Sequence, residues 1–207
     1  MPPNLKLLKD ALYVSVGAAA GFGLVALSPY SYCSVDGPSM RPTLNPASED
    51  PSVPPKRDVI LIRRVSGLSE GTRGSVVVLR SPVYAKHLLV KRLAALPGDG
   101  IVPLSHPNAR VRREEPVVLP EGRCWVESDG GFGFADSNSF GPVDASSVVG
   151  VAAAVVWPPS RFLAPLAPPA ACLESRERRL RPSTAAAATA TSASSAGGPP
   201  APPAAST

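Results

Sequence analysis

The chain has 207 residues and a formal net charge of +5 at pH 7, which is dispersed rather than gathered into a basic stripe. That length accommodates one domain with appendages, and the charge pattern argues against nucleic acid as a partner. Its 26 prolines and few aromatic residues indicate that part of the chain is not packed. The three cysteines, Cys33, Cys124 and Cys172, lack metal-ligand spacing. Neither a metal site nor a cofactor is predicted, and free thiols are favoured over a Cys33–Cys124 pair.

An uncharged run of residues, 11–35, follows a short N-terminal flank, residues 1–10. Together with the apolar residues just before it, this run reaches the roughly 20 residues that a bilayer core requires. We therefore predict one transmembrane helix at residues 11–30, ended by Pro29. A cleaved signal peptide is the alternative, but its apolar core normally spans only about 7–15 residues. Lysines before the run predict that the domain after it lies on the opposite side from the cytoplasm or matrix.

Short β-branched runs separated by Gly, Pro, Asn and Asp fill the middle of the chain, with no alternating helical pattern. This arrangement predicts a mostly β, antiparallel domain over residues 31–163. The predicted strands are Asp58–Val65, Ser75–Arg80, His87–Leu96, Ala109–Arg113, Pro116–Leu119, Arg123–Glu127 and Val148–Trp157. After residue 163 the composition becomes rich in Ala, Pro, Ser and Thr, which predicts disorder over residues 164–207.

A serine stands in a stiff turn soon after the predicted anchor, within GPSMRPTL at residues 37–44. Pro38 fixes its own φ and biases Gly37 towards extended geometry, so Ser39 is presented on a restrained backbone. Such a serine can act as a nucleophile if a neighbouring group accepts its proton. The alternative is a simple Pro-rich turn after a membrane helix.

A lysine embedded in an apolar strand, Lys91 in LLVKRLAALPGD, is the candidate base. Strand alternation places Lys91 and Arg92 on opposite faces. If Lys91 faces the packed side, desolvation lowers its pKa from about 10.4 by up to 3–5 units, which yields a neutral amine near pH 7. Such an amine is the base of a Ser-Lys dyad. The alternatives are a lysine that reaches solvent at the sheet edge, or a base at His87 or His106.

A third stretch, WVESDGGFGFADSNSFGPV at residues 125–143, forms a Gly-rich loop with several polar side chains. Asp136 and Asn138 could orient the lysine or a neighbouring backbone group. The alternative is local turn chemistry, in which such side chains cap their own backbone.

GPSMRPTL, KRLAALPGD and DSNSFGPV, in this order after one anchor, resemble the motifs of the type I signal peptidases, which are Ser-Lys serine endopeptidases. The resemblance covers residues 12–162 and is greatest to the mitochondrial inner membrane branch. It implies a β-rich, anchored catalytic domain in the intermembrane space. It also implies a homologous subunit 1 as heterodimer partner, contact with membrane lipid, and cleavage of precursor sorting signals after small residues.

By position, the resemblance assigns Ser39 as nucleophile, with its N–H as oxyanion donor, and Lys91 as general base. Site support is assigned to Gly37, Met40, Asp136 and Asn138, and a structural role near the site to Arg92 and Asp99.

Three positions depart from the family pattern. Ser75 replaces the acid that usually follows the glycine of the second strand. The hydroxyl residue often found two places before the nucleophile is replaced by Gly37, as is usual in the mitochondrial branch. The serine that commonly orients the lysine, two places before the aspartate, is replaced by Phe134. A weakly active or non-catalytic subunit that stabilises an active partner therefore remains an alternative, as does a plastid or bacterial signal peptidase.

Overall fold

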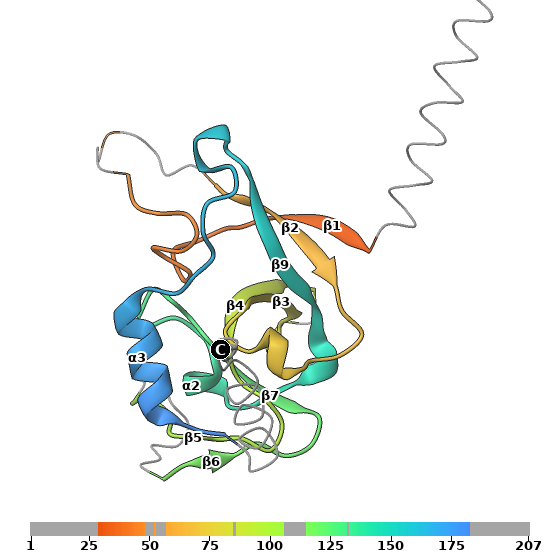
Figure 1. The fold of residues 1–207 in the computed structure, drawn as a ribbon, viewed down its shortest axis with the longest axis vertical. Coiled ribbons are helices and arrows are strands. Elements are labelled where there is room, and N and C mark those ends of the chain that lie inside the picture. Colours follow the sequence, from red (N-terminus) through yellow and green to blue (C-terminus); the bar gives the residue numbers. More distant parts are fainter. Residues whose placement is uncertain are drawn as a thin grey trace, which may run out of the picture.

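The computed structural model describes residues 29–48, 52, 57–84, 86–105, 115–131 and 133–182. A curved antiparallel sheet of seven strands forms the centre of the described chain (Figure 1). In spatial order its strands are β1 (Tyr30–Ser34), β2 (Val59–Arg64), β9 (Val148–Trp157), β3 (Val76–Arg80), β4 (Leu88–Ala95), β7 (Arg123–Glu127) and β8 (Val143–Asp144). A second sheet contains β10 (Leu180–Arg181), β5 (Gly100–Ile101) and β6 (Val117–Val118). The predicted antiparallel β-rich class is confirmed.

The longer strands agree closely with the sequence pattern. The bounds of β7 and β9 are those predicted, and β2, β3 and β4 lie within their predicted runs. The predicted strand at residues 109–113 lies outside the described residues. Strand β6 lies within the predicted run Pro116–Leu119, whereas β5, β8 and β10 were not predicted because two residues are too short to leave a periodic signal. Strand β1 was absorbed into the end of the uncharged run, residues 11–35.

The core covers both faces of the sheet, which explains the unbroken apolar run of β3. Val76 and Val78 belong to one buried cluster, whereas Val77 and Leu79 belong to another. Successive side chains of a strand point to opposite faces, so a strand packed on both sides reads as continuous hydrophobic sequence. The first cluster also contains Met40 from the serine motif.

Four short helical segments and one longer helix connect or cover the strands. They are η1 (Glu70–Thr72), α2 (Ser137–Phe140), η2 (Ala145–Ser147), η3 (Pro159–Arg161) and α3 (Ala170–Arg179). The peptide bonds before Pro42 and Pro158 are cis.

The prediction of disorder from residue 164 is wrong for residues 164–182. These residues contain helix α3 and strand β10, and β10 pairs with β5. Arginines of α3 form ion pairs with buried carboxylates of β7 and of the loop after it. The prediction failed because the composition of the segment contains no information about such distant partners. Residues 183–207 lie outside the described residues.

The predicted anchor also lies outside the described residues, apart from its last two positions, where Tyr30 begins β1. Across the part of the chain that the structure describes, no helix has both the length and the apolarity needed to cross a membrane.

Candidate active site

The serine motif forms a tight turn between β1 and β2. Gly37 has φ +80°, a conformation that disfavours residues with a Cβ, so the extended geometry expected before Pro38 is not adopted. The Arg41 N–H donates to the Pro38 carbonyl at 3.0 Å, and the Leu44 N–H donates to the Met40 carbonyl at 2.8 Å. Met40 is 1% exposed and packs in the core. The turn therefore buries the residue after Ser39 and leaves Ser39 itself only partly buried.

A buried polar network fixes the far side of this turn to β2. The Asn45 amide donates to the carbonyls of Val35 (2.9 Å) and Gly37 (3.2 Å), and its oxygen accepts from the Asp58 N–H at 2.7 Å. Asp58 in turn accepts from the Asn45 N–H at 2.9 Å and pairs with Arg161 at 2.9 Å. These contacts tie together both ends of the segment that carries Ser39.

Lys91 lies in β4 and is only 4% exposed. Burial lowers its pKa to about 8, against the opposing attraction of the Asp136 and Asp129 carboxylates. Among its described contacts, the amine donates to the Ser128 hydroxyl at 3.1 Å rather than to Ser39. A buried lysine with this pKa is neutral in a substantial fraction of molecules near pH 8, as a general base requires.

One short loop links the lysine to the serine turn. Ser128 contacts Lys91, and two residues later the Gly130 N–H donates to the Ser39 carbonyl at 2.9 Å. A Cβ on Gly130 would lie 2.7 Å from the Pro38 carbonyl oxygen and 3.1 Å from that of Ser39. The close approach of the two backbones therefore requires glycine at this position.

Asp136 supports this loop through the backbone rather than through a hydrogen bond to the lysine. As the N-cap of α2 it accepts from the Asn138 N–H at 2.9 Å, and it accepts from the Ser128 N–H at 3.0 Å. Burial raises its pKa. Asn138 extends the network by accepting from the Leu104 N–H at 2.7 Å and donating to Glu127 at 3.3 Å.

Arg92 and Asp99 make structural contacts in separate places. Arg92 is buried on the opposite face of β4 from Lys91 and donates through two nitrogens to Asp129, at 2.9 and 2.5 Å. Asp99 accepts from the Leu96 N–H at 2.7 Å and pairs with Arg73, and so shapes the turn after β4.

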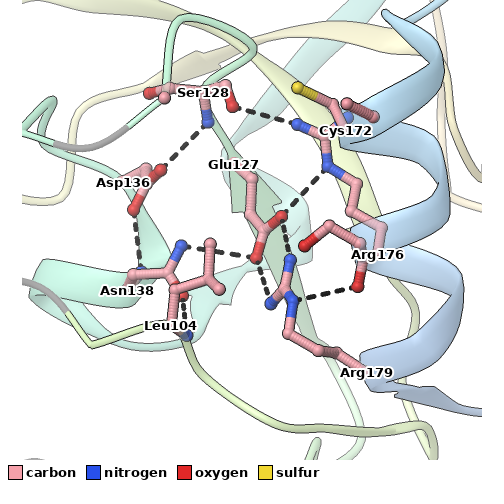
Figure 2. Close-up of a pocket in the computed structure, with 11 residues that line it drawn as sticks. Leu104, Glu127, Ser128, Asp136, Asn138, Cys172, Arg176 and Arg179 are labelled. Atoms are coloured by element: carbon pink, nitrogen blue, oxygen red, sulfur yellow. Dashed lines mark hydrogen bonds and ion pairs between the residues drawn. The ribbon is translucent and has the colours of Figure 1, made fainter.

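Sequence reasoning missed the carboxylates and arginines around Ser128. Glu127 and Asp129 flank this serine. Arg176 of α3 pairs with both acids and Arg179 pairs with Glu127, and Figure 2 shows the contacts with Glu127. Burial works to raise the pKa of both acids, but the facing arginines outweigh it and hold each pKa below its ordinary value. The only signal in the sequence was the pair of acids beside Ser128, which the glycine-rich composition of the loop obscured.

The histidine alternative has no geometric support at His87, which is exposed and lies beside the Tyr84 ring at a centroid distance of 5.6 Å. His106 lies outside the described residues.

The chain matches a known protein family over the segment that contains the serine turn and Lys91. The family model "Signal peptidase, peptidase S26" matches residues 8–106, which include the serine turn and Lys91. The chain belongs to this signal peptidase family and is a serine peptidase of the signal peptidase I type.

Within the family, the chain is similar to "Mitochondrial inner membrane protease subunit 2" of several organisms. It is 38% identical to the Danio rerio protein over 138 residues, which are 65% of this chain and 69% of the relative. It is 36% identical to the Saccharomyces cerevisiae protein over 131 residues, 62% and 68% of the two chains. The Mus musculus protein is 36% identical over 141 residues, 67% and 74% of the two chains.

Proposed function

We propose that the chain is a membrane-anchored endopeptidase that removes sorting peptides from precursors in the mitochondrial intermembrane space, with Ser39 as nucleophile and Lys91 as general base. The main observation in favour is the buried Lys91 amine, whose Ser128 contact belongs to the same short loop that binds the Ser39 backbone. The similarity to inner membrane protease subunits supports the compartment.

In the proposed reaction, neutral Lys91 accepts the Ser39 proton while the Ser39 oxygen attacks the scissile carbonyl carbon. The Ser39 N–H donates to the resulting oxyanion, and such a donor typically contributes about 2.7–4 kcal/mol to transition-state stabilisation. Breakdown of the tetrahedral intermediate breaks the C–N bond, and the Lys91 ammonium protonates the leaving amine. Lys91 then takes a proton from water, which attacks the acyl ester, and Ser39 regains a proton as it leaves.

Ser128 takes the role of orienting Lys91, which a serine at position 134 commonly has in the family. Its hydroxyl holds the Lys91 amine at 3.1 Å, and its own N–H is held by Asp136. The Phe134 ring lies at the same loop, 2.9 Å from where a Gly130 Cβ would be. The lysine therefore keeps a hydroxyl partner although the usual position carries a phenylalanine.

The expected substrates are precursors with inner-membrane sorting signals cleaved after small residues. An extended substrate would add main-chain hydrogen bonds along a strand edge, with shallow pockets selecting small side chains. The expected partners are a homologous subunit 1 and membrane lipid. A subunit that only stabilises that partner is the second candidate, which the Phe134 substitution favours.

The deciding experiment compares wild-type, Ser39→Ala and Lys91→Ala chains in mitochondria that lack the endogenous subunit. Processing of a radiolabelled precursor with an inner-membrane sorting signal is measured together with the abundance of subunit 1. The proposal predicts that each variant lowers processing by a factor on the order of 10² to 10⁴ while subunit 1 remains at its normal level.

Lys86→Ala is the matched control because Lys86 is an exposed lysine just before β4, and its processing is expected to equal that of wild type. Unchanged processing in Ser39→Ala or Lys91→Ala would leave only the stabilising role.

A further inference from the structure

Helix α3 contacts three consecutive residues at the end of β7, Glu127, Ser128 and Asp129, which we call the lysine-holding segment. Figure 2 shows the contacts with Glu127 and Ser128. Arg176 donates to Glu127 at 3.0 Å, to the Ser128 carbonyl at 2.9 Å and to Asp129 at 2.9 Å. Arg179 donates through two nitrogens to Glu127, at 2.9 and 2.8 Å. The helix therefore binds the residue that contacts Lys91 as well as both of its neighbours.

Ser128 is held from two sides. Its N–H donates to Asp136 at the start of α2, and its carbonyl accepts from Arg176 of α3. Fixing the peptide groups on both sides of a residue fixes the direction of its Cα–Cβ bond, which leaves the side chain a choice of a few staggered rotamers. In the rotamer that the structure shows, the Ser128 hydroxyl accepts from the Lys91 amine at 3.1 Å.

Burial makes the ionic contacts of α3 necessary. Arg176 is 8% exposed, and the Glu127 and Asp129 side chains are almost fully buried. Within the described residues, both ion pairs of Glu127 come from α3. A buried carboxylate that loses its cation is strongly destabilised, so the lysine-holding segment would have to move or take up water.

Further contacts fix the helix in place. Arg92 donates to the Leu166 carbonyl at 3.0 Å before α3, and β10 pairs with β5 after it. Arg179 also donates to the Val102 carbonyl at 3.0 Å. A cavity of about 220 Å³ remains between α3 and the lysine-holding segment, lined in part by Ser128, Asp136 and Cys172.

We propose that Arg176 and Arg179 are positioning residues for catalysis, and that α3 acts as a strap that holds Ser128 against Lys91. This proposal rests on the Ser-Lys mechanism proposed above. Under this proposal, the described residues after residue 163 contribute to catalysis by positioning Ser128.

The test measures precursor processing as a function of pH, with the full-length chain and subunit 1 in detergent-solubilised membranes. Arg176→Gln removes the strap's charge, exposes the cavity side of Ser128 to water and leaves Asp129 paired with Arg92 alone. Exposure to water favours the charged form of the Lys91 amine. The loss of one cation beside Asp129 does the same, because Asp129 and Asp136 are the charged groups that act on Lys91. We expect processing at pH 7 to fall about tenfold and the pH at which activity rises to move upwards, so that the deficit narrows above pH 9.

Arg178→Gln is the matched control because it removes an exposed arginine from the same helix, and it should leave the pH profile unchanged. Arg176→Lys, which keeps the charge, should restore part of the loss. In a Ser128→Ala background, Arg176→Gln should lower processing by a smaller factor than in the wild-type chain, since the part of its effect that acts through the Ser128 hydroxyl is already lost.

The pH at which activity rises does not depend on the fraction of a variant that folds, so the test remains valid if Arg176→Gln folds poorly. Arg179→Gln provides a second, milder substitution. The proposal is overturned if neither Arg176→Gln nor Arg179→Gln moves the profile, or if Arg178→Gln moves it equally. Unchanged processing by Ser39→Ala would instead refute the underlying mechanism, so the two failures are distinguishable.

Discussion

Lys91 and Arg92 show how neighbouring cations in one strand acquire different chemistry. Arg92 faces a carboxylate that accepts two of its hydrogen bonds, so its charge is neutralised by Asp129. Lys91 faces a neutral hydroxyl, so burial dominates and its pKa falls to about 8. Strand alternation predicted that the two residues would lie on opposite faces. It could not predict their partners, because Ser128 and Asp129 belong to a strand end more than 30 residues later.

A substitution at Gly130 tests whether catalysis needs the close contact between the serine turn and the loop after β7. In Gly130→Ala the new Cβ would overlap the Pro38 carbonyl at 2.7 Å and displace the Ser39 backbone. Because a displacement of about 1 Å at a reacting group typically costs about 10²-fold in rate, we expect precursor processing to fall by about that factor.

Gly67→Ala is the control because a Cβ at Gly67 would meet nothing within 4 Å. Normal processing by the Gly130 variant would mean that the Ser39 backbone does not need this close contact.

The turn between β1 and β2 depends on one buried asparagine. Asn45→Ala leaves the Val35 and Gly37 carbonyls and the Asp58 N–H without their partner. We expect the free energy of unfolding to fall by about 1–3 kcal/mol, the cost of leaving buried polar groups unsatisfied. Urea unfolding of the full-length chain in detergent, followed by the fluorescence of buried Trp125, measures this change.

Ser146→Ala removes an exposed hydroxyl hydrogen bond to Asp144 and should leave the unfolding free energy nearly unchanged. Equal stability of the Asn45 and Ser146 variants would show that the network does not hold the turn.

The accuracy of the predicted elements follows the kind of signal that each one leaves. The strands β2, β3, β4, β7 and β9 were predictable because each is a β-branched or apolar run bounded by turn residues. Helix α3 was not predictable, since its stability depends on Glu127 and Asp129, more than 40 residues away. The motifs indicated Ser39 and Lys91 as candidates, but the loop that links them emerged only from the three-dimensional contacts.

At the scale of the whole molecule, segments distant in sequence converge on one loop. The serine turn precedes β2, Lys91 lies in β4 of the seven-stranded sheet, and arginines of α3 bind the end of β7 and the two residues after it. Family membership makes the chain a serine peptidase, and the proposed division of roles among these segments explains how its buried lysine can act as a base.

The most direct measurement of the central claim is the pH dependence of precursor processing by the wild-type chain with subunit 1. In the proposed mechanism only the neutral Lys91 amine accepts the Ser39 proton, and burial lowers the pKa of this amine to about 8. Processing should therefore rise about tenfold per pH unit below that value and level off above it. A rate that is constant between pH 6 and pH 9, or that levels off near pH 6.5 as for an ordinary histidine, would contradict a lysine base.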